Sequence, residues 1–239
     1  MKGVILSINP KVTIIDITHE IEPQNITSAA FVLFACHRDF PAGTIFACVV
    51  DPGVGSGRRA IAAASDGHTF VGPDNGIFSL VLAGQATIVS IENDQFFRKP
   101  VSPTFHGRDI FAPAAAYLSA GTDLEDLGPA IEDPILLPDI RSHILSKNVI
   151  EGRVIHIDRF GNIVTNITAE EAGETFKLEL GGRSIDERRE FYAGAVPDRP
   201  FAIVGSVGFV EVSVNGGSAA QQLSAKIGSP VRAVLNETT

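Results

Sequence analysis

The residues best able to do chemistry lie in four short segments, of which residues 51–59 are the densest. They read Asp-Pro-Gly-Val-Gly-Ser-Gly-Arg-Arg and directly follow an apolar run. Ligands of open α/β sheets bind beyond the carboxyl ends of strands, and glycines let a ligand approach the backbone closely. The third glycine of a dinucleotide fingerprint would fall on Arg58, and no Gly-Lys-Ser/Thr of a phosphate loop follows. The segment therefore favours a ligand-binding loop of another kind, with a surface turn carrying two solvated arginines as the alternative.

Residues 104–109 form the second segment, Thr-Phe-His-Gly-Arg-Asp, and lead into an apolar stretch typical of a helix. A histidine directly before a helix is well placed for acid–base chemistry, because the helix dipole acts on its charge. A local capping or packing role for His106 is the alternative. His19 follows another apolar run and has the same two interpretations. We expect the other histidines to be structural or exposed: His37, His68, His143 and His156.

The third and fourth segments are residues 73–76 and 158–162. The first reads Pro-Asp-Asn-Gly, which indicates a tight turn. The second contains an acid, an aromatic and an amide, Asp158, Phe160 and Asn162. That grouping suits hydrogen bonding and stacking with a purine, and a plain hairpin turn is the alternative.

The elements that position these segments change in character along the chain. Up to about residue 145, near-continuous apolar runs predict strands covered on both faces, and a strand, a helix and a strand in sequence predict a parallel pair. Strands are predicted at 12–17, 44–50, 60–64, 69–72 and 86–91, and helices at 1–8, 29–36 and 109–120. The fold class is therefore α/β with a mainly parallel sheet in the N-terminal domain.

A segment rich in proline and charge, residues 134–147, is predicted to be the linker. Beyond it, residues 153–167 and 208–214 alternate apolar and polar side chains, which is typical of half-exposed antiparallel strands. We expect two domains, an α/β domain over 1–145 and a smaller antiparallel β-barrel over 149–239.

Composition excludes several classes of function. The net charge of −9 leaves no basic stripe to neutralise phosphates, so we expect no nucleic-acid partner, and an acidic chain suits a cationic small molecule. No apolar run is long enough for a membrane helix, and the first residues lack the pattern of a signal peptide. Cys36 and Cys48 match neither a redox pair nor a metal knuckle. We therefore expect two reduced thiols in a cytoplasmic protein without a membrane partner.

Taken together, these motifs and their order resemble the S-adenosyl-L-methionine (SAM) hydroxide adenosyltransferases, relatives of the SAM-dependent fluorinase and chlorinase. The resemblance runs from residue 1 to the C-terminus. The matching motifs are residues 1–3, 16–19, 40–44, 50–55, 73–76, 104–109, 157–162 and 206–220.

The resemblance implies an enzyme that hydrolyses SAM to adenosine and methionine, with SAM as the substrate and no cofactor or metal. It implies a catalytic triad of Asp51, Arg58 and His106. It also implies a homotrimer in which SAM is bound between the first domain of one subunit and the second domain of its neighbour. The residues implied to line the SAM pocket are Phe105, Gly107, Asp158, Phe160, Asn162, Tyr192 and Ser206.

Two other functions remain open beside hydrolysis. A SAM-dependent halogenase is disfavoured by Asp51 and His106, because the halogenating relatives carry other residues there. A non-catalytic protein that binds SAM or adenosine is the alternative of a different class. Family members begin with a strand ending in Asp-Phe-Gly, whose aspartate binds the ribose, ahead of the Met-Lys-Gly found here at residues 1–3. We therefore expect poor activity from the chain as written, and higher activity once a native upstream segment is added.

Overall fold

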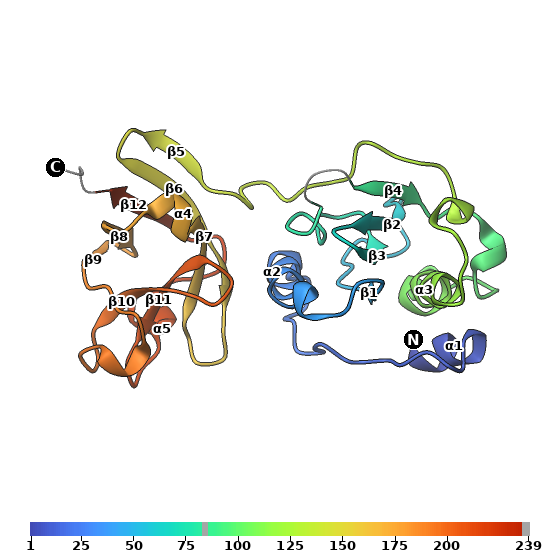
Figure 1. The fold of residues 1–239 in the computed structure, drawn as a ribbon, viewed down its shortest axis with the longest axis horizontal. Helices are drawn as coiled ribbons and strands as arrows, with labels where there is room; N and C mark the ends of the chain where they lie inside the picture. Colours follow the sequence, from blue (N-terminus) through green and yellow to red (C-terminus); the bar gives the residue numbers. More distant parts are fainter. Residues whose placement is uncertain (83–85, 236–239) are drawn as a thin grey trace. The chain divides into compact units, whose positions relative to one another are not determined.

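The computed structural model describes residues 1–82 and 86–235, which form two compact units, Met1–Leu137 and Pro138–Thr239 (Figure 1). Within the segment predicted to be the linker, β5 (His143–Ser146) pairs antiparallel with β6 (Val149–Ile157). No helix in the described ranges is long and apolar enough to cross a membrane.

The first unit contains a four-stranded mixed sheet in the order β1-β3-β2-β4. Its strands are β1 (Ile45–Ala47), β2 (Ala60–Ser65), β3 (His68–Pro73) and β4 (Thr87–Ser90). Only β1 and β3 are parallel, whereas β2 is antiparallel to both β3 and β4. The expectation of a mainly parallel sheet was therefore wrong for the described residues.

The direction of β3 is set by the two-residue turn Asp66-Gly67. Ser65 and His68 face each other across it, and both turn residues have positive φ, 50° and 75°. A two-residue turn with two positive φ values favours a tight antiparallel hairpin, and Asp-Gly is one of its preferred sequences. The short apolar runs on either side of Asp66 therefore form one hairpin.

Residues 12–17, predicted as a strand, are extended but belong to no sheet. Ile15 and Ile17 are exposed, so the apolar run is not buried on both faces. Among the described residues, β1 pairs only with β3, and residues 12–17 lack a neighbouring strand to complete a backbone ladder.

Two layers of helix cover the two faces of this sheet (Figure 1). On one face, α2 (Ile26–Cys36) packs Ala29 and Leu33 against side chains such as Phe70. Asn25 caps α2 by accepting a hydrogen bond from the Ser28 backbone N–H at 3.0 Å. On the other face lies α3 (Ala112–Ser119), which shares a core with β2, β3 and β4.

The remaining helical segments of the first unit are short. They are α1 (Lys2–Ile8), the 3-10 turns η1 (His37–Asp39), η2 (Asp94–Phe96) and η4 (Leu124–Leu127), and the π-helical turn η3 (Gly107–Phe111). The helix predicted over residues 109–120 is thus a π-helical turn continued by α3. This turn matters for the site because it begins directly after His106.

The second unit is a nearly closed antiparallel β-barrel-like sheet, as the alternating pattern predicted. Its strand order is β10-β11-β7-β6-β12-β8-β9, with β5 beside β6. Closure comes from Arg188, just after β9, which bridges to Ala202 in β10. Besides β5 and β6, the strands of this sheet are β7 (Ile163–Thr168), β8 (Phe176–Leu180), β9 (Arg183–Ile185), β10 (Pro200–Val204), β11 (Phe209–Val214) and β12 (Pro230–Leu235).

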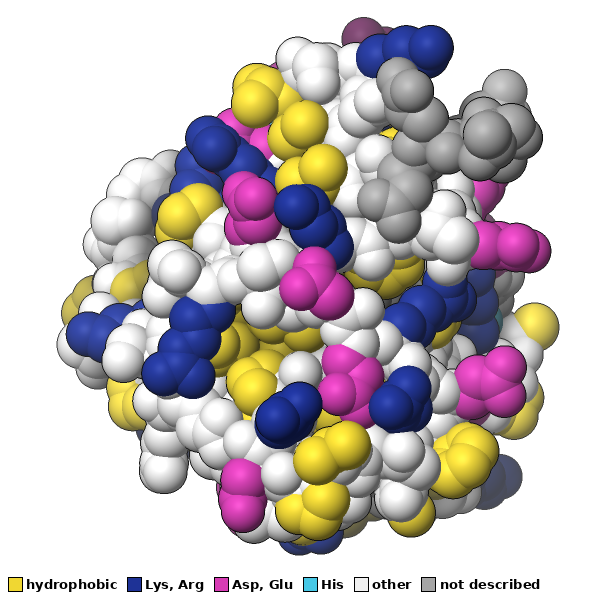
Figure 2. Space-filling model, turned by 90° about the vertical axis from the view of Figure 1, so that its left-hand side faces the viewer, with side chains coloured by type: hydrophobic (Ala, Val, Ile, Leu, Met, Phe, Trp, Pro, Cys, Tyr) yellow, Lys and Arg dark blue, Asp and Glu magenta, His cyan; other side chains and the backbone are white. Residues whose placement is uncertain are grey.

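Short helical turns occupy the connections of this barrel: α4 (Ala169–Ala172), η5 (Tyr192–Gly194) and α5 (Ala219–Gln222). The inward side chains of the strands form one apolar core around residues such as Ile163, Leu178 and Val212. On the face shown in Figure 2, Lys and Arg side chains are interspersed with Asp, Glu and apolar side chains.

Candidate active site

Three predicted catalytic side chains, Asp51, Arg58 and His106, lie in direct contact. The Nη2 of Arg58 donates a hydrogen bond to Oδ2 of Asp51 at 2.6 Å, and the same nitrogen lies 3.3 Å from Nδ1 of His106. The Arg58 and Asp51 side chains are only 8% and 4% exposed. Residues separated by 48 positions in the sequence are therefore brought together in one cluster, in which the side chains of Asp51 and Arg58 are desolvated.

The loop after β1 folds so that Arg58 returns to Asp51. The Ser56 hydroxyl donates to the Gly53 carbonyl at 2.7 Å and accepts the Arg58 backbone N–H at 3.2 Å. Gly55 has a φ of +79°, and a Cβ there would lie 2.1 Å from the carbonyl oxygen of Pro103. Only glycine permits this contact, which places the Asp51 loop against the segment that leads to His106.

Arg58 is fixed by three further features of its surroundings. Its Nη1 donates to the Arg59 carbonyl at 2.6 Å. Its guanidinium carbon lies 5.3 Å from the ring centroid of Phe111, a cation–π arrangement. The Arg59 carbonyl also accepts the Asp74 backbone N–H at 3.0 Å. The guanidinium is thus held on one face by an aromatic ring and at its edge by two acceptors.

Two polar atoms of this cluster are buried without a hydrogen-bond partner among the described residues, Oδ1 of Asp51 and Nε of Arg58. Unsatisfied buried polar atoms are costly and are concentrated at functional sites. The second oxygen of Asp51 is thus a carboxylate acceptor that Arg58 leaves free. A carboxylate in this position can accept a hydrogen bond or proton from a water molecule.

A cavity of about 410 Å³ adjoins Asp51. It is lined by Ile21, Glu22, Pro23, Gln24, Val49, Val50, Asp51 and Pro52. Asp51 therefore lies at the wall of a hollow that a small ligand can enter, at the end of the apolar run that contains β1.

His106 stands at the N-cap position of η3 without a side-chain capping hydrogen bond, and its neighbours Phe105 and Gly107 differ in exposure. Phe105 is half exposed, with the Arg108 guanidinium carbon 4.7 Å from its ring centroid. Gly107 is buried, and a Cβ there would lie 3.4 Å from both the Met1 Sδ and a Val49 methyl. Phe105 is thus available for contact with a ligand, whereas Gly107 provides close packing.

The segment at residues 73–76 supports the loop rather than joining the catalytic cluster. Asp74 is almost fully buried and accepts hydrogen bonds from Arg59 Nε at 2.8 Å and from the Ile135 backbone N–H at 2.7 Å. Asn75 donates to the Val50 carbonyl at 2.9 Å. These contacts hold the chain on both sides of the Asp51 loop.

In the second unit, both oxygens of Asp158 close the hairpin between β6 and β7. Oδ1 accepts the backbone N–H groups of Phe160 and Asn162 at 2.8 and 2.9 Å, and Oδ2 accepts the Asn162 side-chain amide at 2.9 Å. The hairpin interpretation of this motif is therefore confirmed. Phe160 is 63% exposed, with the Arg159 guanidinium carbon 4.8 Å from its ring centroid.

Tyr192 and Ser206 lie in two connections of the same barrel. Ser206 is exposed in the turn between β10 and β11. The Tyr192 hydroxyl donates to Oε2 of Glu211 at 3.4 Å. Burial raises the pKa of the Glu211 carboxyl, and burial followed by Glu211 raises the pKa of Tyr192. Glu211 was missed in the sequence, where the only signal was an acid in the middle of an alternating apolar strand.

The remaining histidines lie outside the cluster. His19 is exposed and its Nε2 lies 3.3 Å from Oδ1 of Asp16. His37 and His68 are buried within an aromatic core, and burial lowers the pKa of His156. In residues 1–82 and 86–235, no three His, Cys, Asp or Glu side chains gather in a group that could hold a metal ion.

Comparison with known proteins identifies one family over most of the chain. Residues 1–128 match the SAM hydroxide adenosyltransferase N-terminal domain, and residues 152–232 match the SAM hydroxide adenosyltransferase C-terminal domain.

Individual relatives point the same way. An (R)-S-adenosyl-L-methionine hydrolase of Thermus thermophilus is 39% identical over 97% of this chain and 92% of its own length. A fluorinase of Actinoplanes is 29% identical over 90% of this chain and 81% of its own length. Among solved structures, an uncharacterized conserved protein from Thermotoga maritima is 35% identical, with a TM-score of 0.86 over 98% of this chain and 93% of that one.

Proposed function

The chain belongs to the SAM hydroxide adenosyltransferase family, and on that premise we propose that it hydrolyses S-adenosyl-L-methionine to adenosine and L-methionine. The observation that carries this proposal is the desolvated contact of Asp51, Arg58 and His106, in which Asp51 keeps one unpartnered oxygen.

The chemistry of SAM sets the demand on this cluster. Its sulfonium leaves the 5′ carbon of the ribose as the neutral thioether of methionine, so the leaving group needs no general acid. Water is a weak nucleophile and must lie in line behind that carbon, about 3–3.5 Å away. The task of the protein is therefore to position and polarise one water molecule.

Each member of the cluster has a distinct part in this task. Asp51 accepts a hydrogen bond from the water through Oδ1 and takes its proton as the C–O bond forms. Arg58 holds Asp51 through Oδ2 and balances its charge. His106 contacts the water from the other side. Attack by a hydroxide-like oxygen on a sulfonium removes charge, so a site with little water favours the transition state.

The residues of the second unit supply binding rather than chemistry. We propose that Phe160 and Tyr192 flank the adenine, and that Asn162 and Ser206 offer polar contacts to the rest of the substrate. Asp158 contributes by holding the turn that presents Phe160 and Asn162. Phe105 and Gly107 complete the substrate contacts, and the assembly we propose is a homotrimer.

The names of the hydrolase relatives specify the (R) epimer at the sulfonium, and we extend that preference to this chain. The test supplies purified protein with each sulfonium epimer separately and identifies the products by mass spectrometry. Adenosine with methionine supports the proposal. A 5′-halo-adenosine in the presence of halide would assign a halogenase, and unchanged SAM of both epimers, bound but not consumed, would assign a binding protein.

A matched pair of variants makes this test specific. Asp51→Asn removes the acceptor while keeping its shape, and Asp66→Asn changes an exposed aspartate that pairs only with Arg38. If Asp51→Asn loses hydrolysis and Asp66→Asn keeps it, the reaction takes place at the cluster.

A further inference from the structure

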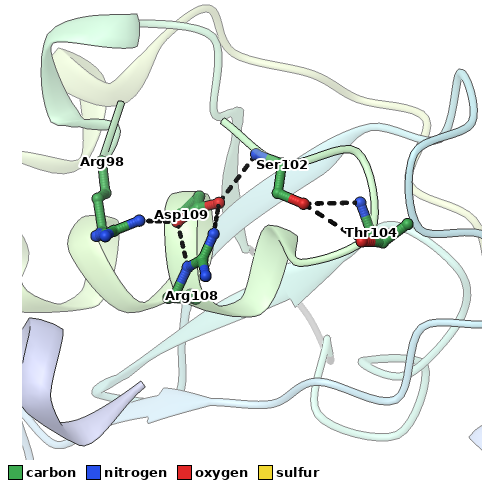
Figure 3. A network of polar contacts seen from close by, with 5 residues as sticks. All are labelled: Arg98, Ser102, Thr104, Arg108 and Asp109. Carbon is green, nitrogen blue, oxygen red and sulfur yellow. Dashed lines mark hydrogen bonds and ion pairs between the residues drawn. The ribbon is translucent and has the colours of Figure 1, made fainter. Parts of the chain in front are cut away.

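Asp109 is the most completely bound carboxylate in the first unit that the proposed mechanism does not use. Its side chain is 0% exposed. Oδ1 accepts hydrogen bonds from Arg108 Nε at 2.7 Å and Arg98 Nη1 at 3.1 Å, and Oδ2 accepts from Arg108 Nη2 at 2.8 Å and the Ser102 backbone N–H at 2.9 Å (Figure 3). The Arg108 guanidinium, with Ser102 and Arg98, holds the pKa of this carboxyl well below its usual range.

The partners of Asp109 come from both ends of one loop. Arg98 precedes the loop, Ser102 lies within it, and Arg108 and Asp109 lie in η3 after it. The Arg98 backbone N–H also donates to the Asp109 carbonyl at 2.9 Å. A single buried carboxylate therefore ties together the two ends of the segment 98–109 (Figure 3). Phe105 and His106 belong to this segment of the chain.

The turn that carries Asp109 also carries two contacts of Arg58. His106 directly precedes η3, with Nδ1 3.3 Å from Arg58 Nη2. Phe111 ends η3, and its ring centroid lies 5.3 Å from the same guanidinium. π-helical turns are rare and occur frequently at functional sites. Relaxing η3 to α-helical spacing would rotate His106 relative to Phe111 and separate one of them from Arg58.

We infer that Asp109 is a positioning residue for the proposed hydrolysis. By clamping Arg98, Ser102 and Arg108, it keeps η3 in its π-helical form and thereby holds His106 against Arg58. It does not touch the substrate. This inference rests on the proposed function, because the geometry that Asp109 maintains is that of the proposed catalytic cluster.

The variant Asp109→Asn keeps the size of the side chain but removes its charge and one acceptor. We expect kcat to fall about 10- to 100-fold while KM changes about threefold or less, because a displacement of about 1 Å at a reacting group has an effect of this size. Since Asp109 is buried, Arg98→Gln serves as a milder second variant. It removes one partner that is half exposed, and should lower kcat less in the same direction.

A double-mutant cycle separates positioning from general destabilisation. If Asp109 acts through His106, Asp109→Asn should lower kcat by no more than about threefold when His106 is already alanine. Equal loss in both backgrounds would overturn the inference. Val81→Ala, a core change on the α2 face of the sheet, controls for lost stability: a variant of similar melting temperature should keep its kcat.

Hydrogen–deuterium exchange supplies a readout that does not need activity. The peptide covering residues 98–111 should exchange faster in Asp109→Asn, and the Ser102 amide most of all. If this peptide exchanges at the same rate in Asp109→Asn as in the parent, Asp109 does not hold the segment in place, whether or not the enzyme is active. Absence of SAM hydrolysis by the parent chain, with faster exchange in the variant, would instead count against the proposed function and leave the clamp standing.

Discussion

Gly55 lies so close to Pro103 that a Cβ on it would sit 2.1 Å from the Pro103 carbonyl oxygen. The contact joins two backbones, the loop that carries Asp51 and Arg58 and the loop that leads to His106. The geometry of the cluster therefore depends on a glycine that is not one of its three members.

The variant Gly55→Ala should destabilise the protein by about 1–3 kcal/mol, because it combines a positive φ with a backbone clash. It should also lower kcat by moving Arg58 away from His106. Urea unfolding and turnover with SAM measure the two effects. The matched control is Gly57→Ala in the same loop, where a Cβ meets nothing within 4 Å. If Gly55→Ala behaves like Gly57→Ala, the contact with Pro103 does not matter.

Replacing Asp51 by asparagine should lower kcat on the order of 10²-fold or more, since it removes the acceptor of the water proton. Binding of SAM, measured by calorimetry, should change far less. Asp66→Asn, at an exposed turn that asparagine tolerates, should retain the parent rate. Hydrolysis by Asp51→Asn at that rate would show that another group activates the water.

His106→Ala should lower turnover by a similar factor with little loss of SAM binding, because in the proposed mechanism His106 contacts the water. Arg58→Lys keeps the charge but loses the fork whose Nη2 reaches Asp51 and His106 while its Nη1 reaches the Arg59 carbonyl, so it should also be impaired. Arg38→Lys, in an exposed ion pair with Asp66, is the matched control. If the variants raise KM more than they lower kcat, both residues act in substrate binding rather than in the chemical step.

Glu211 should make the stability of the second unit depend on pH. Burial raises the pKa of its carboxyl, so the folded state binds a proton more tightly than the unfolded state. The resulting stability is fully present below the unfolded pKa, about 4.3, and is lost as pH rises through the folded value. Urea unfolding from pH 4 to pH 8 should show this loss in the parent and a smaller one in Glu211→Gln. The control is Glu179→Gln on the exposed face of β8. Parallel curves for the parent and Glu211→Gln would refute this linkage.

The chain should form a homotrimer at assay concentration, a prediction that follows from family membership. Light scattering coupled to size exclusion measures the mass directly, against 25.3 kDa for one subunit. A fully active monomer would show that catalysis does not require a neighbouring subunit.

The family and the chemistry of this protein follow from its sequence. Local pattern predicted the helix before residue 36 and the strands near residues 60–64, 69–72 and 208–214, because apolar spacing and capping residues act over a few positions. Motif order identified Asp51, Arg58 and His106 as candidates. The alternation beyond residue 150 predicted the antiparallel barrel. In each case the determining interaction is local, or is repeated often enough to be visible in the residue pattern.

Tertiary structure alone decided which residues meet. The Asp66-Gly67 turn, short enough to be overlooked between two apolar runs, made the first sheet mixed rather than mainly parallel. Several contacts join residues that no repeating sequence pattern relates. They are the contact of Arg58 with His106, those of Asp109 with its partners, and that of Tyr192 with Glu211. Such contacts depend on how whole loops pack and on which polar atoms become buried away from water. Both are properties of the folded chain rather than of any short segment.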